Sequence, residues 1–203
     1  MKRFIDIVIA LTGLVLAAPV FAVAWLAIRL TSPGPAVFRQ ARLGRGERPF
    51  TMYKFRTMYI DNDDAIHRRY VRSLLTEDAP PTGGQNGLYK LEADPRVTRV
   101  GRWLRATSLD ELPQLVNVLK GDMSLVGPRP VLAWEAELFD PEERVRFEVR
   151  PGLTGLWQVS GRSRLSMRDA LELDVEYVRR QSVALDLALL AKTVPALLRR
   201  GAA

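Results

Sequence analysis

Residues 7–28 read IVIALTGLVLAAPVFAVAWLAI, an uncharged run near the N-terminus that decides how the chain is organised. As one straight α-helix it would reach about 33 Å, at about 1.5 Å per residue, which is enough to cross the hydrocarbon core of a bilayer. A cleaved signal peptide fits less well, because the apolar run continues well beyond the small residues at 17–19. The run therefore predicts a membrane segment.

A proline and the flanking charges indicate how this segment would lie in a membrane. Pro19 stands near the middle of the run, where proline removes a helical hydrogen bond, so a bend is expected there. Positive charge, which favours the cytoplasmic side, flanks both ends, at Lys2 and Arg3 before the run and from Arg29 onward after it. A re-entrant helix–break–helix hairpin over residues 1–30 would return both ends to one face, and a single kinked span is the alternative.

After TSPGP at residues 31–35 the composition becomes that of a soluble domain. We expect this second domain to cover residues 31–203 and to be α+β in class, mainly helical. Residues 37–42 and 50–57, separated by a Gly-Arg-Gly turn, predict a short β-hairpin. Residues 62–87 are polar and predict a helix followed by a loop.

Two further segments predict amphipathic or apolar helices. Arginine recurs every three residues from Arg96 to Arg105, between apolar side chains. This pattern suits either a basic helix on anionic lipid or a solvated helix face with a buried opposite side. Residues 182–200 form an apolar stretch that ends in two arginines and predicts a helix bent at its internal proline. Both segments are candidates for interfacial helices at a membrane surface.

The composition of the 203-residue chain excludes several kinds of chemistry. Without cysteine there is no disulfide scaffold, thiol nucleophile or Cys-ligated zinc, and a single histidine, His67, disfavours a Ser-His-Asp triad. The net charge is +7, and arginine supplies 25 of the 30 basic residues. Because arginine binds phosphate through paired hydrogen bonds, this composition indicates a phosphate-bearing partner.

The stretch SLDE at residues 108–111 has the spacing of a helix capping box, with a hydroxyl at the cap and a glutamate three residues later. A helix start also attracts phosphate and keeps a nearby carboxylate ionised. An ionised Asp110 could attack phosphorus without a general base, provided that Mg²⁺ and arginines offset the repulsion between the two anions. Nearby cations are Lys120 and Arg129, the latter in the stiff turn GPRP at residues 127–130.

Five motifs closely resemble those of the bacterial monotopic phosphoglycosyl transferases, also called bacterial sugar transferases, and they cover nearly the whole chain in the expected order. They are KFRTM at residues 54–58, SLDELPQ at 108–114, NVLKGDMS at 117–124, GPRP at 127–130 and RPGLTG at 150–155. The resemblance implies a re-entrant membrane hairpin joined to a compact, mostly helical catalytic domain on the cytoplasmic face of the bacterial inner membrane.

The reaction implied by the resemblance is the transfer of a sugar 1-phosphate from a UDP-sugar to polyprenyl (undecaprenyl) phosphate, with release of UMP. It would be the first membrane step in the synthesis of an exopolysaccharide, O-antigen or other glycoconjugate. The implied partners are the UDP-sugar, the polyprenyl phosphate, membrane lipid and downstream glycosyltransferases. Mg²⁺ is the implied cofactor, and nucleic acid has no role.

The resemblance also assigns catalytic roles to four residues. The family's Asp-Glu dyad falls on Asp110 and Glu111, which are also the expected metal ligands. Asp110 would be the nucleophile that forms a covalent aspartyl phosphosugar, and Glu111 would help to hold Mg²⁺ or handle the acceptor's proton. Lys54 and Asp174 match two further catalytic positions. For contacts with phosphate and the nucleotide we expect Arg56, Arg129, Arg150, Gln158 and Arg162.

One position departs from the family pattern. Members often carry Ser-Pro at the membrane break, where this chain has Ala18-Pro19, so the hairpin would depend more on Pro19 and on other partners. The larger relatives also carry further N-terminal transmembrane helices that this sequence lacks. We therefore expect either a small family member or the catalytic part of a longer one.

Two other functions are compatible with parts of the sequence. Asp61-Asn62-Asp63 resembles the DxD carboxylates of a metal-dependent glycosyltransferase, although no Rossmann-like βαβ pattern precedes it. A basic protein that binds acidic lipid or nucleic acid without catalysis would explain the net charge, although the uncharged N-terminal run does not suit a nucleic-acid binder. Formation of UMP rather than UDP would exclude the first alternative, and mutation of Asp110 would test the second.

Overall fold

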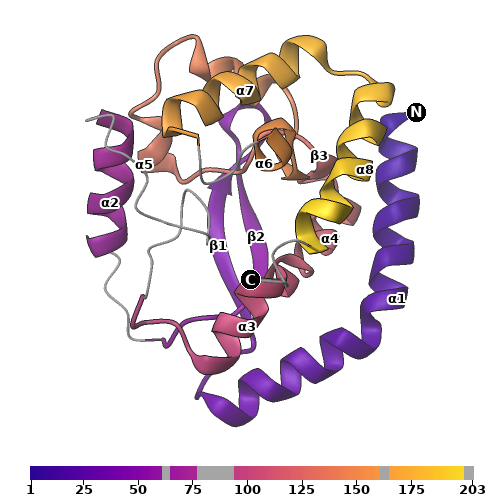
Figure 1. The fold of residues 1–203 in the computed structure, drawn as a ribbon, viewed down its shortest axis with the longest axis vertical. Helices are drawn as coiled ribbons and strands as arrows, with labels where there is room; N and C mark the ends of the chain where they lie inside the picture. Colours follow the sequence, from indigo (N-terminus) through magenta and orange to yellow (C-terminus); the bar gives the residue numbers. More distant parts are fainter. Residues whose placement is uncertain (61–64, 77–93, 161–164, 199–203) are drawn as a thin grey trace.

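Helices make up most of the part of the chain that the structure describes, and two small sheets lie among them (Figure 1). The computed structural model describes residues 1–60, 65–76, 94–160 and 165–198. The helices are α1 (Lys2–Thr31), α2 (Ala65–Thr76), α3 (Arg99–Thr107), α4 (Gln114–Lys120), α5 (Ala133–Ala136), α6 (Leu156–Ser160), α7 (Met167–Arg180) and α8 (Val183–Leu198), with 3₁₀ turns η1 (Arg45–Glu47), η3 (Leu109–Glu111) and η4 (Glu143–Glu148). The strands are β1 (Val37–Leu43), β2 (Pro49–Phe55), β3 (Ser124–Val126) and β4 (Gly152–Thr154). The predicted class, α+β and mainly helical, is confirmed.

The uncharged N-terminal run lies in α1, a single helix of 30 residues that contains Pro19. Its ribbon changes direction about halfway along, so the predicted break is a bend within one helix rather than a gap between two (Figure 1). Among the described residues, α1 is the one helix long and apolar enough to cross a membrane, and only 11% of its most apolar window is buried. A core helix of a soluble protein would be mostly buried, so α1 presents an apolar surface that its own chain does not cover.

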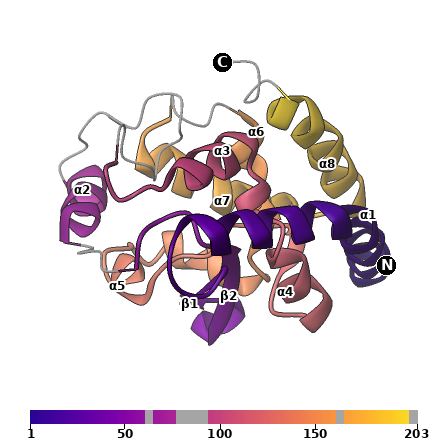
Figure 2. The same cartoon turned by 90° about the horizontal axis from the view of Figure 1, so that it is seen from below.

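α1 contacts the rest of the chain near both of its ends. Its buried residues form two pairs, Asp6 with Ala10 and Ala24 with Ile28, and the members of each pair are about one helical turn apart. Large apolar side chains between these pairs are exposed, namely Leu11, Val15, Leu16 and Val23. Seen from below, the helix lies across one face of the molecule (Figure 2).

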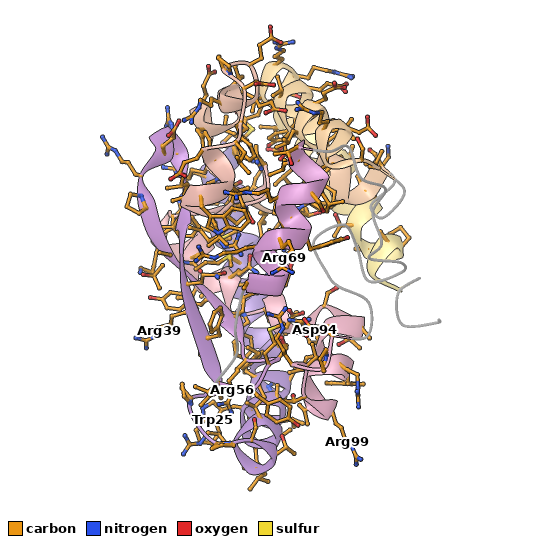
Figure 3. The ribbon with its side chains drawn as sticks, turned by 90° about the vertical axis from the view of Figure 1, so that its left-hand side faces the viewer. Trp25, Arg39, Arg56, Arg69, Asp94 and Arg99 are labelled. Atoms are coloured by element: carbon orange, nitrogen blue, oxygen red, sulfur yellow. The ribbon has the colours of Figure 1, made fainter. Side chains whose placement is uncertain are left out.

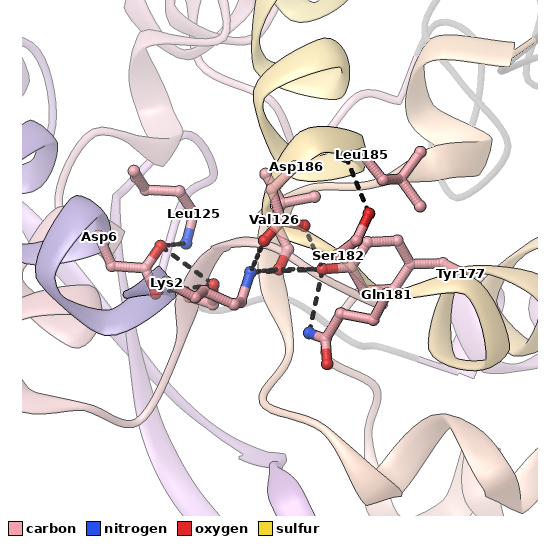
Figure 4. A network of polar contacts seen from close by, with 10 residues as sticks. Lys2, Asp6, Leu125, Val126, Tyr177, Gln181, Ser182, Leu185 and Asp186 are labelled. Carbon is pink, nitrogen blue, oxygen red and sulfur yellow. Dashed lines mark hydrogen bonds and ion pairs between the residues drawn. The ribbon is translucent and has the colours of Figure 1, made fainter.

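A polar network fixes the N-terminal end of α1 (Figure 4). Asp6 accepts a hydrogen bond of 2.9 Å from the hydroxyl of Ser124 in β3. Lys2 donates to the carboxylate of Asp186 in α8 at 2.7 Å. The hydroxyl of Tyr177 in α7 donates to the same carboxylate, also at 2.7 Å. Paired charges and hydrogen bonds therefore join α1 to three elements that are distant in sequence.

Aromatic packing and one arginine hold the C-terminal end of α1. The ring centroids of Phe21 and Phe55 lie 5.2 Å apart, and the buried cluster around them includes the apolar side of α3. Arg56, which follows β2, donates to the carbonyl and hydroxyl oxygens of Ser32 at 2.8 and 2.9 Å. Both ends of α1 are thus attached to the same folded body.

Two sheets, each of two strands, connect distant parts of the chain. β1 and β2 form the predicted antiparallel hairpin, in which Val37 pairs with Phe55. β3 and β4 pair in parallel. The sequence analysis does not predict this second sheet, because strands of three residues are too short to show a periodic pattern. The backbones approach closely here, since a side chain on Gly127 would collide with the carbonyl of Arg150.

The basic segment before and within α3 is only partly an exposed helix face. Arg96 precedes the helix and pairs with Asp94 at 2.8 Å. Arg105 is half-buried and donates to the hydroxyl of Thr57, which lies two residues after β2. Arg99 points away from the body (Figure 3), and Arg102 is exposed as well. A single exposed face is therefore wrong for Arg96 and Arg105, because each has a buried partner.

Asn117 ties α4 to β2 and is fully buried. Its side-chain oxygen accepts a 3.0 Å hydrogen bond from the backbone N–H of Tyr53, and its side-chain nitrogen donates to the carbonyl of Thr51 at 2.7 Å. Asn117→Ala removes both hydrogen bonds and leaves the N–H of Tyr53 and the carbonyl of Thr51 without these partners. We therefore expect the free energy of unfolding to fall by about 2 kcal/mol. Chemical denaturation measures this loss, with the exposed Glu172→Gln as control. An unchanged unfolding midpoint would contradict the expected role of Asn117.

Candidate active site

The end of β2 and the turn η3 bring a lysine and two carboxylates together. The ammonium of Lys54, the penultimate residue of β2, is 3.4 Å from Oε1 of Glu111. The same oxygen is 3.7 Å from the guanidinium of Arg129. Asp110 is close enough for its charge to act on Lys54. The structure therefore gathers four of the predicted site residues in one place.

A sharp change of direction places Asp110 in the interior. α3 ends at Ser108, whose φ of 58° and ψ of 15° lie in the left-handed region that few residues other than glycine adopt. Asp110, two residues later in η3, is only 4% exposed. The predicted capping box is wrong, because the Ser108 side chain makes no capping hydrogen bond and α4 begins only after Pro113. Side-chain cations, rather than a long helix N-terminus, therefore surround Asp110.

The pKa of Lys54 is changed by burial and by the charged groups around it. Burial is the largest influence and lowers the pKa of Lys54 below its ordinary value. Glu111 acts next and raises that pKa, whereas Arg129 lowers it and Asp110 raises it again. The ammonium group is thus poorly solvated and depends on the two carboxylates for its charge balance. A cation in such a setting interacts strongly with an incoming anion, because little water screens it.

Arg105 is a further cation beside the dyad, and the sequence analysis did not place it in the site. Its Nε donates to the hydroxyl of Thr57 at 2.9 Å. Burial lowers the pKa of Arg105, and the charges of Asp110 and Asp94 raise it. Thr57 belongs to the same KFRTM motif as Lys54. One motif therefore supplies one cation of the site and positions another.

Arg56 lies in that motif but has a different task. Its guanidinium reaches the end of α1 (Figure 3) and donates to the backbone carbonyls of Ser32 and Pro33. Arg56 is buried at this junction. These hydrogen bonds commit both terminal nitrogens of Arg56 to holding α1 against β2, and the contact of Arg56 with phosphate stays a prediction.

Asp174 forms a buried ion pair with Arg146. The carboxylate and guanidinium are 2.7 Å apart, and the two side chains are 2% and 1% exposed. The same nitrogen of Arg146 donates to the carbonyl of Arg129 at 2.6 Å. Burial raises the pKa of Asp174 to about 6, against the lowering effect of Arg146 and Arg129. These contacts favour a role for Asp174 in positioning the loop that carries Arg129.

The structure describes two of the three remaining predicted contacts, Arg150 and Gln158. Arg150 is exposed just before β4. Gln158 lies in α6, and its side-chain oxygen is close to Gly155. Arg162 and the Asp61-Asn62-Asp63 triplet lie outside the described residues. The roles of Arg150, Gln158 and Arg162 in binding phosphate or nucleotide stay predictions.

Asp110 and Glu111 are the carboxylates available for Mg²⁺. Within residues 1–60, 65–76, 94–160 and 165–198, no three His, Cys, Asp or Glu side chains are grouped to hold a metal ion. Mg²⁺, however, is often bound by one or two carboxylates, and water and substrate phosphates fill its remaining positions. The dyad fits a site of that kind, in which the substrate would complete the coordination.

This arrangement suits chemistry on a phosphorylated ligand, since a buried carboxylate is surrounded by cations beside an apolar helix. The chain belongs to the bacterial sugar transferase family, whose sequence profile matches residues 1–200. Family membership agrees with the resemblance carried by the five motifs.

Three relatives illustrate the proteins to which the chain is similar. An undecaprenyl-phosphate galactose phosphotransferase of Salmonella typhimurium is 40% identical over 203 residues, which cover 100% of this chain and 41% of the relative. A UDP-glucose:undecaprenyl-phosphate glucose-1-phosphate transferase of Caulobacter vibrioides is 44% identical and covers 97% and 69%, respectively. The exopolysaccharide production protein ExoY of Sinorhizobium fredii is 40% identical and covers 98% and 87%. The chain thus spans about two fifths of the length of several relatives, the Salmonella protein among them.

Proposed function

We propose that the protein transfers a sugar 1-phosphate from a UDP-sugar to a polyprenyl phosphate such as undecaprenyl phosphate, and releases UMP. The names of the Salmonella and Caulobacter relatives support this reaction. The observation that carries the proposal is the buried carboxylate of Asp110 next to Lys54 and Arg105, in a chain of this family. The reaction would begin the assembly of an exopolysaccharide or related glycan on its lipid carrier.

In the first step the carboxylate of Asp110 is the nucleophile. One oxygen attacks the β-phosphorus of the UDP-sugar, which carries the sugar, and the bond from that phosphorus to the bridging oxygen breaks. The electron pair stays on the bridging oxygen, which leaves as part of UMP. The sugar phosphate remains bonded to Asp110. No general base is required, because a carboxylate that is ionised at neutral pH has no proton to lose.

Lys54 and Arg129 would bind the diphosphate of the donor. Both cations lie beside Glu111 before substrate binds, so the diphosphate would compete with Glu111 for them. This exchange would free Glu111 to serve with Asp110 as a ligand of Mg²⁺. The metal, when bound, supplies positive charge that offsets the repulsion between the nucleophile and the phosphate oxygens.

In the second step the polyprenyl phosphate attacks the phosphosugar. An oxygen of the acceptor bonds to the phosphorus, the bond from phosphorus to Asp110 breaks, and the electron pair returns to the carboxylate. The product is a polyprenyl diphosphate sugar. Asp110 is thereby restored for the next donor molecule.

We also propose that α1 is a re-entrant segment on the cytoplasmic face of the inner membrane. Its ends are attached to one folded body, through Lys2 at one end and through Arg56 near the other. A helix that crossed the bilayer completely would have its ends about 30 Å apart on opposite faces, which does not suit such attachments. Pro19 supplies a bend, and the positive residues at both ends favour the cytoplasmic side.

Product analysis tests the proposed reaction. Detergent-purified protein is incubated with undecaprenyl phosphate, Mg²⁺ and, in separate mixtures, each of a panel of UDP-sugars. UMP together with a lipid diphosphate sugar would agree with the proposal and identify the donor. UDP as the nucleotide product would contradict it, since that product means glycosyl transfer.

Lys54→Met removes the ammonium charge and keeps much of the side-chain volume. A charge that acts on phosphate in a poorly solvated site is lost, so we expect the rate of UMP release to fall about 100-fold. The melting temperature should change little, because burial of the Lys54 charge is itself unfavourable. Transfer rates and thermal unfolding are measured beside Lys192→Met, which removes an exposed lysine. An unchanged transfer rate would contradict the role of Lys54.

A further inference from the structure

The first two turns of α1 bond to every residue of β3 (Figure 4). The carboxylate of Asp6 accepts hydrogen bonds from the hydroxyl of Ser124 at 2.9 Å and from the backbone N–H of Leu125 at 3.0 Å. The ammonium of Lys2 donates to the carbonyl of Val126 at 2.9 Å. A strand of three residues is therefore held along its whole length by a helix that lies 118 residues away in sequence.

Asp6 completes one edge of the small parallel sheet. Within the described residues β3 and β4 make a sheet of two strands, so the other edge of β3 has no strand beside it. Backbone N–H groups alternate between the two edges of a strand. The N–H of Ser124 donates to the carbonyl of Pro151, on the side of β4, at 2.8 Å, and the N–H of Leu125 donates on the opposite edge. Asp6 supplies there the acceptor that a third strand would otherwise provide.

The carboxylate of Asp6 lies in buried surroundings. Asp6 is 4% exposed, and its partners Ser124 and Leu125 are 1% and 4% exposed. Burial of a charge costs free energy unless hydrogen bonds compensate for the lost water. The uncharged run of α1 begins at the next residue, so an apolar side chain at position 6 would suit the helix itself better. The position of this carboxylate is therefore explained by what it holds in β3.

β3 leads directly into the turn that carries Arg129. Only Gly127 and Pro128 separate Val126, the last residue of the strand, from Arg129. The prolines on both sides of Arg129 have fixed φ angles, so the turn is stiff. The guanidinium of Arg129 is 3.7 Å from the carboxylate of Glu111. Because the link is short and stiff, a shift of β3 would move Arg129 away from this place in the site.

We propose that Asp6 is a positioning residue, which sets the place of Arg129 through β3 and so makes the binding of the donor diphosphate depend on α1. The inference rests on the proposed function, in which Arg129 binds that diphosphate. Asp6 itself does not contact the substrate, and no bond is made or broken at its carboxylate. The donor site is complete only when the first turns of the apolar helix are seated on β3.

A double-mutant cycle tests whether Asp6 acts through Arg129. UDP is titrated calorimetrically into detergent-purified protein, which gives both the affinity and the number of sites per chain. Asp6→Leu removes the acceptors and keeps α1 apolar, so we expect the affinity for UDP to fall about tenfold. Arg129→Gln should lower it by a similar factor. In protein that already carries Arg129→Gln, Asp6→Leu should change the affinity less than about twofold, because the guanidinium that it would displace is no longer there.

Two milder variants and a control accompany the cycle. Asp6→Asn keeps an acceptor for the N–H of Leu125 and can donate to the hydroxyl of Ser124, so its UDP affinity should stay within about threefold of the wild type. Ser124→Ala removes one of the two partners of Asp6 and should lie between the wild type and Asp6→Leu. Ser32→Ala removes a buried hydroxyl at the other end of α1, where Arg56 donates to it at 2.9 Å, and should bind UDP as the wild type does.

Several results would overturn the assignment. One is an unchanged UDP affinity in Asp6→Leu, and another is an equal loss in the wild-type and Arg129→Gln backgrounds, which would mean that Asp6 acts by another route. Fewer sites per chain with unchanged affinity would overturn it too, since a purely structural role predicts that result. If Asp6→Leu does not fold, Ser124→Ala supplies the same cycle. UDP carries the diphosphate whichever nucleotide the reaction releases, so failure of the proposed function is seen in the product analysis and failure of this inference in the cycle.

Discussion

Asp110→Asn should abolish transfer, with UMP release reduced at least about 10³-fold, because an amide cannot attack phosphorus as a carboxylate does. Asparagine has nearly the same shape as aspartate, and Asp110 is buried in a short 3₁₀ turn, so the fold should persist. The measurement is UMP release from the UDP-sugar in a single turnover. Glu172→Gln removes an exposed carboxylate from α7 and serves as the matched control.

Asp110→Ala makes the same test and avoids asparagine, which could deamidate back to aspartate. We expect both variants to keep a melting temperature close to that of the wild type, so that lost activity cannot be attributed to unfolding. If Asp110→Ala kept more than about a tenth of the wild-type rate, Asp110 could not be the nucleophile. The two-step mechanism would then be contradicted, even if UMP remained the product.

Arg146→Met should cause the largest loss of stability, about 3–5 kcal/mol near pH 8. The variant leaves Asp174 buried without its cation and removes the donor to the carbonyl of Arg129. Methionine still fills space beside Phe139, whose ring centroid lies 5.2 Å from the guanidinium carbon of Arg146. The loss therefore comes mainly from the charge. Chemical denaturation at several pH values measures it.

The stability of Arg146→Met should also depend on pH. In the wild type burial raises the pKa of Asp174 from 3.8 to about 6, so the stability that its protonation provides is present below about pH 4 and is lost as the pH rises through 6. Arg146 lowers that pKa, so its removal should raise it further. The variant should then continue to lose stability above pH 6, where this group no longer changes the stability of the wild type.

A double variant provides the control for this pair. Adding Asp174→Asn to Arg146→Met removes the uncompensated carboxylate, so part of the lost stability should return near pH 8. The double variant should also show no extra loss of stability between about pH 6 and 8. An equal deficit for the single variant at pH 5 and pH 8 would contradict the proposed protonation of Asp174.

Most of the residues that the structure gathers at the candidate site were predictable from the sequence. Lys54, Asp110 and Glu111 come from motifs whose spacing is specific, and the structure brings them together with Arg129. The β-hairpin and the apolar N-terminal helix were predictable as well, since a glycine turn and a long uncharged run are strong local signals. A bend in α1 followed from Pro19.

What the arginines contact could not be predicted from the sequence. Arg56 and Arg105 stand in recognisable patterns, but the partners of each guanidinium, Ser32 and Thr57, are brought close only by the packing of α1, β2 and α3. Ser108 was predicted as a helix cap because its spacing to Glu111 is typical of one. The end of α3 overrides that local preference and places Ser108 in the left-handed region. Tertiary contacts thus decide these positions.

Intact-protein mass spectrometry of the protein mixed with its UDP-sugar and Mg²⁺, without any polyprenyl phosphate, tests the central claim most directly. We predict a mass increase of one sugar phosphate that maps to the peptide containing Asp110. It should be missing from Asp110→Asn and should disappear when undecaprenyl phosphate is added. Protein that remains unmodified, in a preparation that transfers the sugar phosphate as soon as the lipid is supplied, would contradict a covalent intermediate on Asp110.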